Sequence, residues 1–118
     1  MESIIVIIAL SALAQETRLA VFRLLVQAGP TGLPAGEIAA RLNCPSNTLS
    51  FHLRELSHAG LVRAARQSRS IIYTADFEAM RGLLGFLTEN CCTLLPGASC
   101  NPDTPGCGSS PMPEESFS

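Results

Sequence analysis

The sequence predicts a small, mainly α-helical domain that carries one β-hairpin. Its 118 residues suffice for a single hydrophobic core. The composition, 47% apolar with no Trp and one Tyr, indicates a core of aliphatic side chains, which suits packed helices. Helical apolar spacing recurs along the chain, and two strand-like runs lie before the last helical stretch. The expected order is therefore four helices, a hairpin and a fifth helix.

The first two helices differ in their apolar pattern. Residues 4–14 are apolar on all sides, so we expect a helix that another helix or a second subunit covers. From Glu16 the pattern becomes amphipathic, with Arg18 and Arg23 placed between apolar residues. Gly29-Pro30 then ends the second helix, because this pair breaks helical structure.

The N-terminal apolar run also imitates a secretion signal, with Ala12-Leu13-Ala14 as the cleavage site. However, Glu2 makes the preceding segment acidic, where a signal peptide is positive. The run is also shorter than the roughly 20 residues that span a bilayer. We therefore expect a cytoplasmic protein with no membrane partner, whose five cysteines stay reduced.

The third helix is expected to be short. Pro34 stands where the first helical turn accepts a proline, because that position needs no backbone N–H. Residues 35–42 then form the helix, with Ile38 and Leu42 facing the core. Asn43-Cys44-Pro45 makes the turn that separates it from the fourth helix.

The fourth helix has signals at both ends. Ser46 or Asn47 is expected to cap its start, and Ala59-Gly60 to end it with a C-terminal glycine. A buried stripe is predicted by three leucines at helical spacing, Leu49, Leu53 and Leu56.

Two strands and a fifth helix complete the predicted domain. Residues 61–65 and 70–75 contain β-branched and aromatic residues, and residues 66–69 join them as a hairpin tip. Asp76 is expected to cap the last helix, which is apolar.

The chain is expected to have two parts. Residues 1–92 form the folded domain. Residues 93–118 are too rich in Gly, Pro and Ser to form a core, so we expect a tail that is flexible without a ligand.

Charge is distributed unevenly around a net charge of −2. Residues 1–45 are neutral, residues 46–73 hold four arginines against Glu55, and residues 74–118 hold six acids against Arg81. All basic residues are arginines, which bind phosphates and guanine edges better than lysines do. The basic middle segment therefore indicates a face that binds a polyanion.

Two short helices, a tight turn and a hairpin make a winged helix-turn-helix, in which the second helix enters the major groove of DNA. Asn can pair with adenine, and Phe can contact a thymine methyl group. Arg66 and Arg69 at the wing tip are placed for phosphates or a minor groove. The candidate DNA contacts on the fourth helix are Ser46, Asn47, Thr48, Ser50, Phe51 and Arg54.

Three motifs agree with this interpretation: Ser-Asn-Thr-Leu-Ser-Phe-His-Leu-Arg-Glu-Leu at residues 46–56 with Ala-Gly-Leu-Val at 59–62, Glu-Thr-Arg-Leu at 16–19, and Ile-Tyr at 72–73. Together they resemble the ArsR/SmtB metalloregulatory repressors, over roughly residues 9–90. The resemblance implies a homodimer, formed through the first and last helices, on palindromic double-stranded operator DNA. We see no nucleophile with a paired base and no Gly-rich phosphate loop, so no enzymatic activity is expected.

Four of the five cysteines lie near the C-terminus, and two of them, Cys91 and Cys92, are adjacent. Neighbouring Cα atoms are about 3.8 Å apart, closer than the roughly 4.4–6.8 Å of unstrained disulfides. Thiolates are preferred ligands of soft metal ions. The adjacent pair is therefore expected to bind an ion and not to bridge to itself.

The resemblance also narrows the choice of inducer site. Residues 34–42 hold no cysteine where the prototype arsenic sensors carry theirs, and the last helix has no His for a zinc-type site. The adjacent pair resembles that of variant arsenite sensors. As(III) or Sb(III), which take three thiolates, is expected to bind Cys91, Cys92 and Cys100, with Cys107 as a possible substitute or fourth ligand.

Two alternatives stay open: a Cd/Pb/Zn sensor that uses all four C-terminal cysteines, and a thiol-redox sensor of the same fold. A small metal-handling protein is disfavoured because it would leave the recognition helix and wing unexplained. His52 is expected to pack and form hydrogen bonds, and Cys44 to act as a small buried hydrophobic residue.

Overall fold

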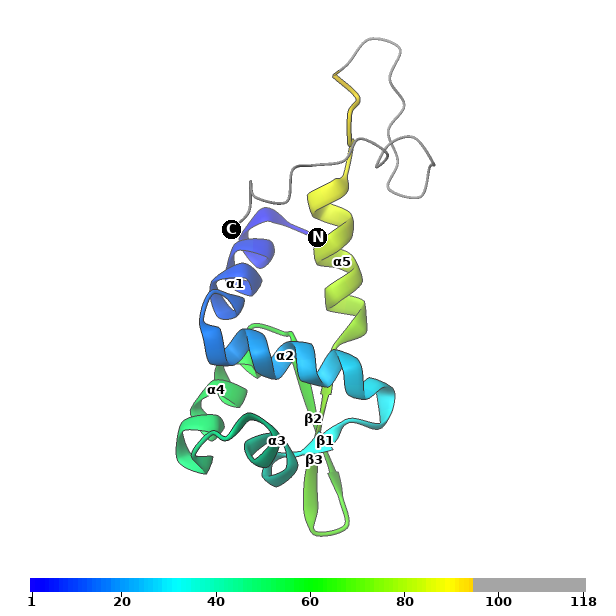
Figure 1. Cartoon of the computed structure of the whole chain (residues 1–118). Coiled ribbons are helices and arrows are strands. Elements are labelled where there is room, and N and C mark those ends of the chain that lie inside the picture. Colours follow the sequence, from blue (N-terminus) through cyan, green and yellow to red (C-terminus); the bar gives the residue numbers. More distant parts are fainter. Residues whose placement is uncertain (95–118) are drawn as a thin grey trace. The chain divides into compact units, whose positions relative to one another are not determined.

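The computed structural model describes residues 1–94 of the chain. The chain divides into two compact units, Met1–Leu83 and Leu84–Ser118. The order of elements matches the predicted winged helix-turn-helix with one short strand added. In sequence order they are α1 (Ser3–Leu13), α2 (Glu16–Ala28), the 3-10 turn η1 (Gly29–Thr31), β1 (Leu33–Pro34), α3 (Ala35–Leu42), α4 (Ser46–His58), β2 (Val62–Gln67), β3 (Ser70–Ala75) and α5 (Phe77–Thr88) (Figure 1).

The core of the first unit lies among α2, α3, α4 and the base of the β2–β3 hairpin. Val21, Leu25 and Ile38 are fully buried there. The predicted stripe on α4 is confirmed, because its three leucines are each at most 2% exposed. Burying one such side chain stabilises the fold by about 1.5–3 kcal/mol. This packing fixes which face of α4 remains at the surface.

The capping of α4 differs from the prediction at its N-terminus and agrees with it at its C-terminus. Pro45, with extended backbone angles, occupies the N-cap position, so the predicted cap by Ser46 or Asn47 is wrong. The Asn47 side-chain oxygen Oδ1 instead accepts a hydrogen bond from the Thr48 backbone N–H at 2.9 Å. The C-terminal glycine is confirmed: Gly60 has φ +78°. The backbone bonds around it, Gly60 to Ser57 and Leu61 to Leu56, make a Schellman motif.

A three-stranded antiparallel sheet has the order β1-β3-β2. The sequence did not predict β1, in which Leu33 pairs with Tyr73 and Pro34 with Ile72. Pro34 therefore lies in an edge strand and forms the N-cap of α3, not its first turn. Proline is tolerated at a sheet edge because it needs no ladder donor there.

The wing is longer than predicted. β2 continues to Gln67, which pairs with Ser70, and Arg66 pairs with Ile71. Arg66 therefore lies on a strand and not at the tip, whereas Arg69 lies in the two-residue turn. Ser68 makes that turn with φ +57°. Figure 1 shows the β2–β3 hairpin projecting beyond the helices of the first unit.

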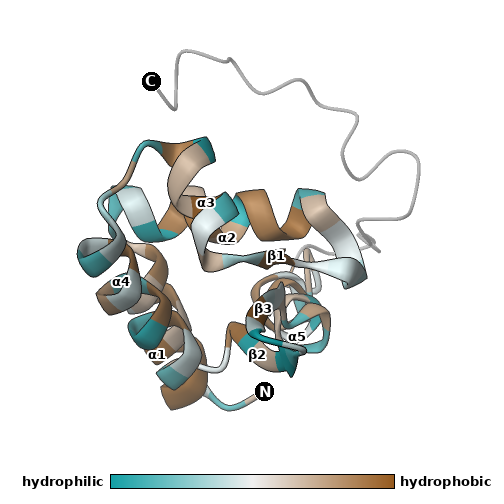
Figure 2. Ribbon diagram, turned by 90° about the horizontal axis from the view of Figure 1, so that it is seen from below, coloured by the Kyte–Doolittle hydropathy of each residue, from teal (hydrophilic) through white to brown (hydrophobic). Residues whose placement is uncertain are grey.

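Helix α1 consists almost entirely of apolar residues. Figure 2 colours the ribbon of each element by the hydropathy of its residues. Of the α1 residues, only Val6 and Ala9 are buried. Within residues 1–94 no single helix is long and apolar enough to cross a membrane; α1 and Glu16–Thr31 meet that test only as a pair bent by 103°. The apolar side chains left exposed at the N-terminus are Met1, Ile4, Ile5, Ile7, Ile8 and Leu10.

Candidate functional site

The outward face of α4 carries all the polar residues that the sequence places there for DNA contact. The buried leucines hold the opposite face against the core. The Phe51 ring is 48% exposed although it is large and apolar, so it is available to a partner. The exposed residues of this reading face are Ser46, Asn47, Thr48, Ser50, Phe51 and Arg54.

The wing supplies two further arginines to the same unit. Arg66 and Arg69 are exposed. Within residues 1–94 neither forms an ion pair, whereas Arg63 at the base of the wing pairs with Asp76. The two distal guanidinium groups thus keep their donors available for phosphate oxygens.

His52 lies beside the reading face but is 8% exposed. Its Nδ1 lies 3.3 Å from Arg18 Nη1. Burial, with the charge of Arg18, lowers the pKa of His52, although Glu55 opposes this shift. The neutral imidazole accepts the hydrogen bond that Arg18 donates. The predicted packing and hydrogen-bonding role of His52 is confirmed.

Arg18 is a residue whose contacts the sequence did not reveal. Its Nε donates to the backbone oxygen of Ala12 at 2.7 Å, and its Nη1 reaches His52. These partners lie 6 and 34 positions away in the sequence. The available signal was the Glu-Thr-Arg-Leu motif, which marks the position without naming its partners.

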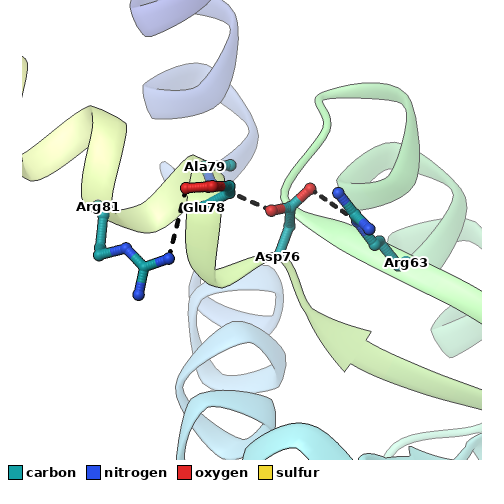
Figure 3. Close-up of polar contacts among 5 residues, drawn as sticks. All are labelled: Arg63, Asp76, Glu78, Ala79 and Arg81. Atoms are coloured by element: carbon teal, nitrogen blue, oxygen red, sulfur yellow. Dashed lines mark hydrogen bonds and ion pairs between the residues drawn. The ribbon is translucent and has the colours of Figure 1, made fainter.

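Asp76 stands between the wing and α5 (Figure 3). Its Oδ1 accepts the Ala79 N–H at 3.0 Å, which confirms the predicted cap, and its Oδ2 accepts Arg63 Nε at 3.0 Å. Partial burial alone would raise the pKa of Asp76. The hydrogen bonds from Ala79 and Arg63, with the Arg63 charge, outweigh burial and hold that pKa below its ordinary value.

Cys91 and Cys92 follow directly after α5 and are half-buried. Their Sγ atoms lie 3.2 Å apart. The backbone turns sharply here, because Asn90 and Cys92 have φ of +58° and +63°. The contact with Cys91, together with desolvation, raises the pKa of the Cys92 thiol.

These two sulfur atoms suit a soft ion, but they are only part of the predicted ligand set. Among residues 1–94 no group of three His, Cys, Asp or Glu side chains is placed to hold a metal. The predicted third ligand, Cys100, and the predicted substitute, Cys107, lie outside the described residues, as does most of the predicted tail. Cys44, in the other unit, packs partly buried against the core, as expected for a small hydrophobic residue.

Comparison with known proteins identifies the family. A family model described as a helix-turn-helix domain matches residues 13–64. The structure of an ArsR-like transcriptional regulator from Rhodococcus sp. RHA1 is 26% identical, with a TM-score of 0.63 over 70% of this chain and 76% of that one. HlyU from Vibrio cholerae N16961 is 32% identical, with a TM-score of 0.59 over 74% of this chain and 97% of that one. The chain belongs to the ArsR family of transcriptional regulators.

ArsR-family membership makes the chain a DNA-binding transcription regulator and not an enzyme, as predicted. A further solved structure, of Mb0332 from Mycobacterium bovis, is described as a homodimeric winged helix-turn-helix DNA-binding domain. It is 26% identical, with a TM-score of 0.58 over 73% of this chain and 80% of that one. The exposed faces of α4 and the wing are therefore the candidate DNA surface of this ArsR-family regulator.

Proposed function

We propose that this ArsR-family regulator is a homodimeric repressor that binds operator DNA without inducer and releases it on binding As(III) or Sb(III). The observation that carries the inducer assignment is the cysteine pair after α5, with its Sγ atoms 3.2 Å apart. Two adjacent thiols on one turn present two soft ligands to a single ion. Trivalent arsenic completes its pyramidal coordination with one more thiolate, whereas zinc prefers four tetrahedral ligands.

Cys100 is the proposed third ligand. Seven residues separate it from Cys92, and fourteen separate Cys107 from Cys92. Doubling a flexible loop costs only about 0.6 kcal/mol, so the shorter closure favours Cys100 modestly and leaves Cys107 as a substitute.

The homodimer is proposed to form through α1 and α5. Support comes from the exposed isoleucines of α1, whose burial against a second copy would remove a large apolar patch from water. The homodimeric M. bovis relative has the same winged architecture. Ile7→Glu should yield a monomer by sedimentation velocity, whereas Ile71→Glu on the wing should remain dimeric.

Release is proposed to act through dimer geometry. The inducer site lies at the end of α5, so an ion bound there would reposition a helix of the proposed interface. Two recognition helices must sit about one DNA turn apart to read a palindrome. A coupling of about 1–3 kcal/mol at each site, typical of allostery, would lower operator occupancy without unfolding.

Redox control is a second candidate function. A structure of HlyU from V. cholerae described as reduced is 32% identical, with a TM-score of 0.58 over 72% of this chain and 90% of that one. In this chain Cys91 or Cys92 would lose a proton and an electron, as would Cys100 or Cys107. One S–S bond would form, and an oxidant such as hydrogen peroxide would take up both electrons.

Thiol counting during titration separates these functions. We expect one arsenite ion per protomer to protect three thiols from a chromogenic disulfide reagent. In the Cys44→Ser variant arsenite should still protect three thiols, because Cys44 is not a proposed ligand. Protection of four thiols by cadmium but of none by arsenite would instead favour the Cd/Pb/Zn sensor. Operator release by diamide but not by arsenite would favour the redox sensor.

A further inference from the structure

Arg18 joins two parts of the DNA-reading unit. Its Nε donates at 2.7 Å to the oxygen of Ala12, near the end of α1, and its Nη1 approaches His52 Nδ1 at 3.3 Å on α4. Its own backbone N–H donates to Gln15 Oε1 at 2.9 Å, which fixes the start of α2. The guanidinium group of Arg18, a residue of α2, therefore contacts both α1, through Ala12, and α4, through His52.

His52 in turn contacts Phe51. The two ring centroids lie 5.6 Å apart with an interplanar angle of 63°, an edge-to-face contact. Phe51 is about half exposed, so the His52 ring packs against a ring that otherwise faces solvent. A ring that reads a thymine methyl group works by van der Waals contact, which weakens sharply with a displacement of less than 1 Å.

We propose that Arg18 is a positioning residue for operator recognition, which holds His52 and thereby orients the Phe51 ring for a thymine methyl group. The inference rests on the DNA-reading role proposed for Phe51. It does not depend on the inducer, because the apo protein reads the operator.

The charges around His52 agree with this role. Arg18 from α2 faces the imidazole of His52, and Glu55 lies on α4, the helix that carries His52. Helix α1 contributes the Ala12 carbonyl group, which accepts a hydrogen bond from Arg18. A neutral imidazole accepts the Arg18 hydrogen bond, whereas a protonated one would place two cations in contact. The hydrogen bond from Arg18 to His52 therefore forms at neutral pH, where the lowered pKa of His52 keeps the imidazole uncharged.

A thymine-to-uracil scan tests the proposal. The probe is a palindromic duplex selected by the wild-type protein from a random pool, with symmetric thymine pairs replaced one at a time by uracil. Uracil lacks the methyl group and keeps the base-pairing edge. For wild type we expect about a fourfold affinity loss per contacted methyl group at one thymine position, the value of one buried methyl group. Arg18→Gln should bind both duplexes equally, and Arg18→Lys should restore part of the discrimination.

Arg23→Gln is the matched control, because it removes the same charge from an exposed position of the same helix. It should keep the wild-type discrimination. Discrimination that persists in Arg18→Gln would overturn the proposal, and so would a wild-type protein that ignores every thymine methyl group while still binding the duplex.

His52 variants keep the proposal falsifiable if Arg18→Gln fails to fold. His52→Gln retains an acceptor for Arg18, whereas His52→Leu does not. We expect His52→Gln to discriminate better than His52→Leu at equal thermal stability. Equal discrimination by the two variants would contradict the proposal. A failed arsenite response leaves all these outcomes unchanged and counts only against the proposed inducer.

Discussion

Arg63 Nε lies 3.0 Å from Asp76 Oδ2, which ties the first strand of the wing to the residue that starts α5 (Figure 3). The same carboxylate caps α5 through the Ala79 N–H. Asp76 thereby connects the base of the wing, which is the proposed DNA-contacting hairpin, to the helix that leads to the cysteine pair.

The cap should contribute more to stability than the ion pair does. Asp76→Ala is expected to lower the free energy of unfolding by about 1–2 kcal/mol, because a helix loses its N-cap. Arg63→Ala should cost less than about 1 kcal/mol, since the Arg63 side chain is 72% exposed. Urea unfolding of the two variants measures both values. Equal losses would show that the ion pair, and not the cap, dominates.

The contribution of Asp76 should depend on pH. Its pKa in the folded state lies below the ordinary value of 3.8. The stabilisation is therefore fully present above that value and is lost as the pH falls through the folded pKa. The difference in unfolding free energy between wild type and Asp76→Asn should be constant near pH 6 and shrink below about pH 3.8. A difference that is unchanged at pH 3 would contradict this assignment.

Gly32 is required where β1 meets β3. It has φ +68°, and a Cβ there would collide with the Tyr73 carbonyl oxygen and the Ile72 side chain. Gly32→Ala should therefore destabilise the fold by about 2–4 kcal/mol in thermal or urea unfolding. Gly36 is the matched control: a Cβ there meets no atom within 4 Å, and the residue is helical. Gly36→Ala should stabilise by up to about 1 kcal/mol.

The wing arginines should bind phosphates without reading bases. Arg66→Gln and Arg69→Gln should each reduce the slope of log K against log salt by about 0.9, because one phosphate contact is lost. Fluorescence anisotropy on selected and scrambled duplexes measures both slopes. Arg81→Gln is the control, since Arg81 already pairs with Glu78 on α5. If both variants show the same salt dependence as wild type, the two wing arginines do not contact DNA phosphates.

Much of the fold follows from local patterns in the sequence. The spacing of the leucines on α4, the glycine at position 60 and the capping Asp76 all predict their observed structures. Two local features of the fold were not predicted correctly: the N-cap residue of α4 and the short strand β1. Pro45 occupies the N-cap position that Ser46 or Asn47 was expected to fill. The strand Leu33–Pro34 has only two residues, which is too short to show the alternating apolar and polar pattern that predicts a strand.

The functional site is less predictable than the fold. The sequence identified the exposed face of α4 because buried leucines fix its opposite face. It did not reveal that Arg18 contacts His52, because helix packing alone brings residues 34 positions apart together. The adjacency of Cys91 and Cys92 is visible in the sequence. The choice between Cys100 and Cys107 depends on residues beyond 94 and stays a prediction.

Operator release by arsenite tests the central proposal most directly. A fluorescent operator duplex bound by the reduced protein is titrated with arsenite, using wild type and the Cys→Ser variants at positions 44, 91, 92, 100 and 107. We predict release from wild type, Cys44→Ser and Cys107→Ser, and continued binding by the variants at 91 and 92. Cys100→Ser should need about threefold more arsenite for release than wild type, because Cys107 takes its place through a loop of twice the length. Arsenite release that survives in both Cys91→Ser and Cys92→Ser would contradict the account.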